Sequence, residues 1–232
     1  MTVSVVEIVD GTTGVLGTAP TVTIATTPVA DDVIAVGVFV TIHSTTVTAV
    51  SGCGATWTQA ISNTATSQPG YIEWVGTGAT SAGTISVTLS TSRSGLVRAR
   101  VVRGLSSGVV AFADAAYGTA TTSTGPVTTS RAAGNGQIVL ESASLSTGAI
   151  TTFPASPTPS TDWATATGIG SSRGSTHRAP VSTNSHSVSV RLSASNLARL
   201  TQVVLGNTPS GTQLLCHATI VASRAAQRAS RW

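Results

Sequence analysis

The chain has 232 residues, of which 41% are hydrophobic and 9% are charged, and its formal net charge is +4. This balance excludes a disordered chain, and the abundance of Thr, Val, Ser, Gly and Ala favours strands over long helices. All twelve basic residues are arginine, which excludes mechanisms that need a lysine, such as a P-loop or a Schiff base.

We expect neither nucleic acid nor a membrane as a partner. Nucleic-acid binding needs a basic patch, whereas most of these arginines are scattered and do not alternate with aromatic residues. No apolar run reaches the roughly 18 residues of a membrane span. The start, MTVSVVEIVDG, carries Glu7 and Asp10 and no basic segment, so we expect it not to be a signal peptide. We therefore expect the chain to be made and folded in a cytoplasm. Cys53 and Cys216 are expected to be reduced thiols.

The first half predicts a series of short strands around Val33–Val40. This run, VIAVGVFV, is apolar on both faces, as in a strand that is covered on both sides. Alternation places Arg98 and Arg100 on the solvent side of their strand. Gly/Thr-rich turns are expected at 11–17 and 76–83. The other expected strands are 3–8, 21–26, 45–50, 57–62, 71–75, 85–89 and 96–102.

The second half repeats this pattern after a Thr/Ser-rich connection at 119–129. Ile138–Leu145 is a weaker copy of the central strand, and further strands are expected at 179–181, 187–192 and 197–205. The repeat shows in four pairs of aligned residues, with offsets between 102 and 106: Ile34 with Ile138, Trp57 with Trp163, Leu89 with Leu192, and Gly104 with Gly206.

This pattern predicts an all-β protein, an antiparallel β-sandwich with two pseudo-repeated halves, 1–118 and 119–206, followed by a basic C-terminal arm at 207–232. Two arrangements fit: two tandem small sandwiches, or one jelly-roll-like sandwich with pseudo-symmetric halves. We favour the single jelly-roll, because each half offers few strands and the connection contains no real linker. The expected core residues are Val33, Ile34, Val36, Val38, Val87, Leu89, Val101, Ile138, Leu140, Val190 and Val203.

The strand succession resembles a known group of proteins. The segments DDVIAVGVFV, GATWTQAIS, YIEWV, ISVTL, LVRARVVRGLSSG, GQIVLESASL and SVSVRL…LTQVVLGN, which span residues 1–206, are similar to the Gly/Thr-rich β-sandwich proteins in virion structural modules of tailed phages that infect actinobacteria, and to related bacterial surface proteins. Their central strand usually follows Gly-Asp, whereas here it follows Asp31-Asp32.

The resemblance implies a non-enzymatic virion component, a capsid decoration, fibre or minor tail protein, without catalytic residues or a cofactor. Such a protein is present in many copies, docks on other virion proteins and on itself as a homo-oligomer, and resides in the virion. An alternative from another class is a carbohydrate-binding or carbohydrate-cleaving jelly-roll, with Trp74 and Glu73 as glycan contacts.

Motifs for enzymatic chemistry are weak. Residues 104–108 read GLSSG and match a nucleophile elbow, but no helical period follows, so we interpret them as a turn. A glycosidase carboxylate pair would come from Glu73, Asp114 and Asp162, each of which we expect to be a turn or surface group. The histidines, namely His43, His177, His186 and His217, lack metal-ligand spacing.

Two further predictions concern aromatic and basic residues. We expect Trp57, Trp74 and Trp163 mainly to fill the core between sheets, with glycan stacking as the alternative. The C-terminal arm carries Arg224, Arg228, Arg231 and Trp232, which suit docking on an acidic partner. The competing interpretation is that residues 214–222 supply another strand of the sandwich.

Overall fold

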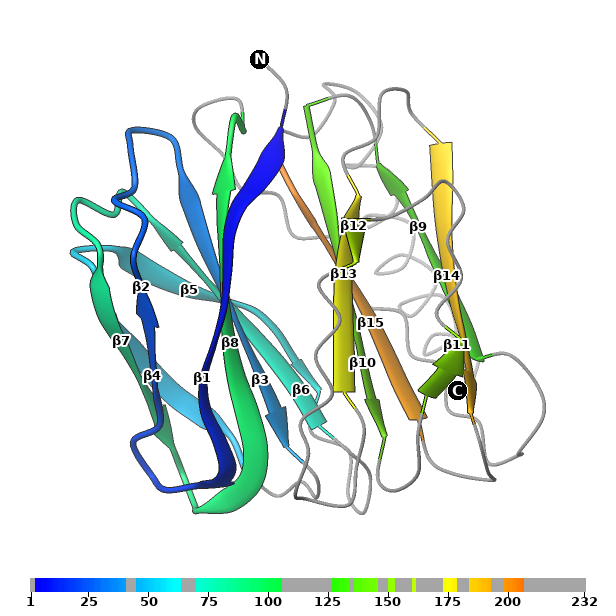
Figure 1. The fold of residues 1–232 in the computed structure, drawn as a ribbon, viewed down its shortest axis with the longest axis horizontal. Coiled ribbons are helices and arrows are strands. Elements are labelled where there is room, and N and C mark those ends of the chain that lie inside the picture. The colour runs from blue at the N-terminus through cyan, green and yellow to red at the C-terminus, as the bar shows by residue number, and fades with distance from the viewer. Residues whose placement is uncertain are drawn as a thin grey trace, which may run out of the picture.

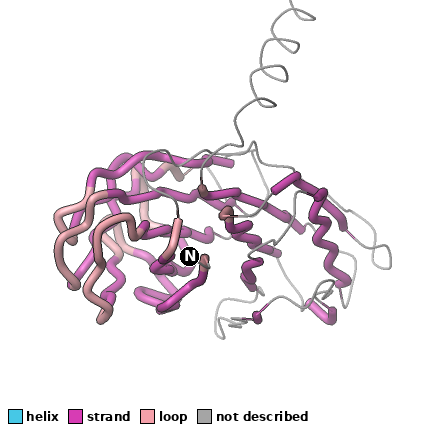
Figure 2. Tube along the Cα trace, turned by 90° about the horizontal axis from the view of Figure 1, so that it is seen from above, coloured by secondary structure: helices cyan, strands magenta, loops and turns pink. Residues whose placement is uncertain are grey.

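The computed structural model describes residues 3–40, 45–63, 70–105, 127–133, 136–145, 150–152, 160–161, 173–178, 184–192 and 198–206. Side chains are described for residues 3–40, 45–62, 70–105, 133, 136–143 and 200–206. These parts of the chain consist of strands and loops, as Figure 2 shows. They contain no helix long and apolar enough to cross a membrane.

The described part of the first half contains eight strands in two antiparallel sheets. Their bounds are β1 Ser4–Leu16, β2 Thr21–Ile24, β3 Val33–Val40, β4 Val47–Gly52, β5 Thr56–Asn63, β6 Gly70–Thr77, β7 Gly83–Leu89 and β8 Arg93–Arg103. Sheet 1 has the order β2-β7-β4, and sheet 2 has the order β1-β8-β3-β6-β5.

The described part of the second half also forms two antiparallel sheets. Its strands are β9 Val127–Ala133, β10 Ile138–Leu145, β11 Ile150–Thr152, β12 Ser160–Thr161, β13 Arg173–Arg178, β14 Asn184–Leu192 and β15 Ala198–Leu205. Sheet 3 has the order β12-β13-β10-β15, and sheet 4 has the order β11-β14-β9. Figure 1 shows sheets 1 to 4 side by side from left to right.

The two halves repeat the same strand order. In sheet 2 the run β8-β3-β6-β5 corresponds to β15-β10-β13-β12 in sheet 3, and β2-β7-β4 in sheet 1 corresponds to β9-β14-β11 in sheet 4. The all-β antiparallel sandwich with two repeated halves is therefore confirmed. Each described sheet draws its strands from one half, so the pairing is that of two stacked sandwiches. Among the described residues, the strand pairing therefore favours two sandwiches over the single jelly-roll that we preferred, and the division into domains stays a prediction.

Strand β3 explains why the two sandwiches stack. Its eight residues are all buried, as the apolar run predicted. One face, which includes Ile34 and Val36, joins the cluster between sheets 1 and 2. The other face, which includes Val33 and Phe39, joins a second cluster with Leu140 of β10 and further residues of β15. Sheet 2 is thus covered on one face by its own partner sheet and on the other by the second half.

The expected core is confirmed wherever the structure describes the side chains. The expected residues that are described are at most 4% exposed: Val33, Ile34, Val36, Val38, Val87, Leu89, Val101, Ile138, Leu140 and Val203. Val190 lies in β14, whose side chains are outside the description. Transfer of such side chains from water is the main favourable contribution to folding, at about 25 cal/mol per Å² of apolar surface.

Two local predictions were wrong. Residues 11–16 of the turn expected at 11–17 are part of β1, which stays paired with β8 from Ser4 to Leu16 through two register shifts that take up the extra residues. Arg98 and Arg100 do not face solvent: they are 2% and 1% exposed, because the second half covers their face of sheet 2. The expected strand at 179–181 lies outside the described residues.

Gly37 leaves space for a buried aromatic ring on that covered face. A Cβ at Gly37 would lie 2.6 Å from the hydroxyl oxygen of Tyr71, which packs against Phe39 with 4.8 Å between ring centroids. We expect Gly37→Ala to lower the free energy of unfolding by about 1–3 kcal/mol, because the buried ring must shift. Denaturant titration measures this loss.

Gly17→Ala is the matched control, because a Cβ at Gly17 meets nothing within 4 Å. It should leave stability within about 0.5 kcal/mol of the parent. Equal stability of the Gly37→Ala and Gly17→Ala proteins would contradict the packing of Tyr71 across β3.

Candidate functional site

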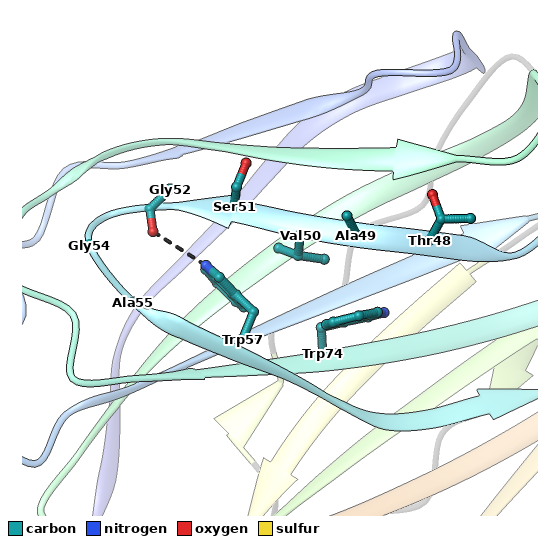
Figure 3. A pocket seen from close by; sticks show the side chains of 9 residues that line it. All are labelled: Thr48, Ala49, Val50, Ser51, Gly52, Gly54, Ala55, Trp57 and Trp74. Atoms are coloured by element: carbon teal, nitrogen blue, oxygen red, sulfur yellow. Dashed lines mark hydrogen bonds between the residues drawn. The ribbon is translucent and has the colours of Figure 1, made fainter.

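A hollow of about 360 Å³ opens between the edges of sheets 1 and 2. Edge strand β4 and the turn that follows it form one side, and Trp57 of β5 and Trp74 of β6 form the other (Figure 3). Among the described residues, nine line it: Thr48, Ala49, Val50, Ser51, Gly52, Gly54, Ala55, Trp57 and Trp74. None of the nine carries a charge.

Trp57 is fixed by its neighbours on two sides. Its ring lies on Gly76, where a Cβ would come within 2.9–3.0 Å of three ring carbons, so a larger residue there would displace the ring. Its indole N–H donates to the carbonyl oxygen of Gly52 at 3.3 Å, across the β4–β5 turn (Figure 3). That turn uses the left-handed region at Cys53 and Gly54, with φ of 56° and 69°. The ring is thereby held beneath β4.

Trp74 lies beside Trp57 on the same face of sheet 2, with its nitrogen at the end of the ring farther from Trp57 (Figure 3). It is half-buried, and its Nε1 is a buried donor that has no hydrogen-bond partner among the residues that the structure describes. Both tryptophans pack against the core between sheets 1 and 2, as expected, and also line the hollow. They therefore present aromatic surface to a space that a small ligand could enter.

Glu73 does not join Trp74 at this site, and the prediction of a shared glycan contact was wrong. Consecutive residues of a strand point to opposite faces, so Glu73 faces the second half while Trp74 faces sheet 1. Glu73 is 0% exposed. Its carboxylate therefore does not reach the hollow, and it offers no surface carboxyl for a glycosidase pair. The other two candidates, Asp114 and Asp162, lie outside the described residues.

Glu73 instead belongs to a buried polar cluster between the two sandwiches. The Tyr71 hydroxyl donates to Glu73 Oε2 at 2.7 Å, and Arg100 Nη1 lies 3.7 Å from Glu73 Oε1. Ala35 pairs with Arg100, and Gly37 pairs with Glu73, so the small residues of β3 make room for the cluster. The polar cluster is enclosed by the apolar residues that join sheets 2 and 3.

Burial dominates the electrostatics of this cluster. It raises the pKa of Glu73, against the opposing effects of Arg100 and of the Tyr71 hydrogen bond. Burial, together with the neighbouring Glu73 carboxyl, also raises the pKa of Tyr71. A buried ion pair repays its desolvation only when both partners are present. The arrangement is suited to fixing how the sandwiches pack, and no described cleft leads to it.

Other carboxylates also tie strands together. Asp10 accepts a hydrogen bond from Arg98 Nη2 at 2.9 Å, and Asp32 accepts one from Arg103 Nη2 at 2.7 Å. Glu7 accepts the backbone N–H groups of 25 and 26 at 2.8 Å each. Although burial by itself would raise the pKa of Glu7, these donors hold it below its ordinary value.

The remaining predicted site residues give no site in the described part of the chain. His177 and His186 lie on β13 and β14, whose side chains are not described, and no metal-binding group of His, Cys, Asp or Glu occurs among the described residues. Cys53 is a buried free thiol, whose pKa is raised by burial. The following lie outside the described residues: His43, His217, Cys216, Trp163, Ser106–Gly108 of the GLSSG motif, and Arg224, Arg228, Arg231 and Trp232.

Sequence reasoning missed the pairing of Trp57 with Trp74. The signal was present in the spacing: Trp74 and Gly76 share a face of β6, and the glycine leaves room for an aromatic ring from the neighbouring strand. It could not be read before the register placed Trp57 opposite Gly76.

The Glu73–Arg100 pair gives a testable pH dependence. Replacing Arg100 by Met leaves a buried carboxyl without its cation, which should cost about 3–5 kcal/mol of stability at neutral pH. Loss of the arginine removes an effect that lowers the pKa of Glu73, so that pKa rises further. A carboxyl with a raised folded-state pKa stabilises the fold at low pH, and this contribution disappears as pH rises through that pKa.

Denaturant unfolding of Arg100→Met between pH 5 and pH 8 should therefore show a deficit, relative to the parent, that grows with pH. Adding Glu73→Gln should remove the pH dependence and restore part of the stability. A deficit that stays constant with pH, or no gain from the second change, would show that the two side chains are not coupled.

Comparison with known proteins adds no assignment to this geometry. No protein-family model, no curated protein and no solved structure matches the chain.

Proposed function

We propose that this chain is a non-enzymatic structural protein of a phage virion surface, either a capsid decoration or a minor tail protein. In this proposal it is made in the host cytoplasm, is present in many copies, and docks on other virion proteins and on copies of itself. The proposal begins from the similarity of its strand succession to such proteins, and the use of charge in the fold supports it.

The observation that carries the proposal is that five of the six carboxylates among the described residues make contacts within the fold, whereas the sixth, Asp31, is exposed in the turn before β3. Glu7 holds the backbone beyond β2, Asp10 and Asp32 bind arginines of β8, and Glu73 lies in the buried cluster. Glu141 accepts a hydrogen bond from Gln202 Nε2 at 2.9 Å. Carboxylates that bind substrate or move protons need access to a cleft. Here they stabilise a stack of sheets, which suits a protein that must persist outside a cell.

Docking is assigned to the C-terminal arm, residues 207–232. Arg224, Arg228 and Arg231 recur at three- and four-residue spacing and are followed by Trp232. In helical form the arginines would share one side. Arginine pairs with carboxylates through two parallel hydrogen bonds, and a tryptophan can serve as a buried anchor, so the arm fits an acidic groove on a neighbouring virion protein.

Incorporation into particles tests both the structural role and the docking role of the C-terminal arm. Mass spectrometry of purified virions should detect the full chain, and a variant with Arg224, Arg228 and Arg231 all changed to Ala should incorporate at least about tenfold less, since losing a buried interfacial charge pair costs about 2–5 kcal/mol. Changing the same three residues to Lys is the matched control. It retains the charge but loses the bidentate geometry, so we expect intermediate incorporation.

Absence of the full chain from particles would refute the structural role. Normal incorporation of the Ala variant, with an unchanged circular dichroism spectrum, would refute the docking arm and leave the structural role standing. A count in the hundreds per particle would indicate the capsid, and a handful would indicate the tail.

A further inference from the structure

We infer that the hollow between β4 and the two tryptophans, Trp57 and Trp74, is a binding site for a neutral saccharide. This goes beyond the proposed structural role, because it gives the protein a ligand outside the particle. Three features support this: the size of the hollow, the uncharged and aromatic chemistry of its walls, and the contacts that hold Trp57 in place.

The dimensions suit a small ligand. Pockets for small molecules enclose about 300–1,000 Å³, and this hollow encloses about 360 Å³. It lies at the edge of the sandwich, where Thr48, Ser51 and Gly54 are exposed, so a sugar unit at the end or side of a longer glycan can enter without opening the fold. A sugar unit that is still part of a longer glycan can bind only at a site that is open in this way.

The chemistry of the walls selects a neutral ligand with an apolar face. No lining residue carries a charge, so an anionic sugar would lose its hydration without gaining a counter-charge. Two half-buried indole rings supply the apolar contact surface. A sugar ring presents C–H groups on one face and hydroxyl groups around its rim, and therefore matches a flat aromatic wall with polar backbone beside it.

One ring of the aromatic wall, Trp57, is already oriented before any ligand binds. Trp57 rests on Gly76 and is hydrogen-bonded to Gly52, so its orientation does not have to be fixed at the moment of binding. Trp74 lies beside Trp57 on the same face of sheet 2 and adds a second indole ring to the wall.

Binding is tested with the full chain on an array that carries neutral hexose and pentose oligosaccharides together with sialylated and uronic-acid glycans. We expect selective binding of neutral members. Titration with the best neutral oligosaccharide should change tryptophan emission, and the affinity should be the same at low and high salt, because no ion pair forms.

Substitutions locate the site. Trp74→Ala should weaken binding by about tenfold or more, whereas Trp74→Phe, which keeps an aromatic face, should lose less. Thr58→Ala is the matched control: Thr58 is exposed, pairs with Val75 of β6, and points to the opposite face of β5 from Trp57, so its loss should leave binding unchanged.

Several results would overturn the inference: no binding to any array member, salt-sensitive binding to acidic glycans alone, or equal affinity of Trp74→Ala and the parent when both have the same circular dichroism spectrum. Binding of a proline-rich peptide that is lost in Trp74→Ala, together with no glycan binding, would assign the hollow to a protein partner instead. Incorporation into particles is measured separately, so failure here leaves the structural proposal intact.

Discussion

The structure depends on the burial of sheet 2 on both of its faces. Strand β3 has apolar residues on both sides, and each side needs its own cover: sheet 1 within the same half, and sheet 3 from the other half. A single sandwich would leave the face with Val33 and Phe39 in water. Because apolar surface is driven out of water in proportion to its area, the two halves are held together by the same effect that folds each of them.

This arrangement determines where charge can be placed. Arg100 and Glu73 lie on the face of sheet 2 that meets the second half, where each compensates the other, and Asp10 and Asp32 hold arginines at the margins of the same sheet. Because these carboxylates are bound within the fold, contacts with other molecules are expected at the sheet edges and turns. The hollow at the β4–β5 turn is such a place, and its two tryptophans combine packing against the core with an accessible aromatic surface.

Much of the fold could be predicted from the sequence, because local signals and tertiary structure agree. Strand β3 is apolar on both faces, β10 is its copy, and the offset between the halves is nearly constant. These three features predicted that the second half repeats the succession of strands in the first, and the sheets share a corresponding strand order. The predictions that failed depended on contacts between residues that are far apart in the sequence. Alternation alone put Arg100 in solvent, since nothing local reveals that a second sandwich covers that face. Glu73 and Trp74 are adjacent in sequence, yet the strand separates them to opposite faces, and the pairing of Trp57 with Trp74 required the register.

The central claim is that the halves stabilise each other, and hydrogen exchange of the full chain with Leu140→Ala tests it most directly. Leu140 of β10 packs in the cluster that includes β3, and its loss should cost about 2–5 kcal/mol. Val139→Ala, on the other face of β10, is the matched control. The account predicts that Leu140→Ala lowers the protection of amides in β3 as well as β10, whereas Val139→Ala acts mainly on β10. Unchanged protection of β3 in Leu140→Ala would contradict it.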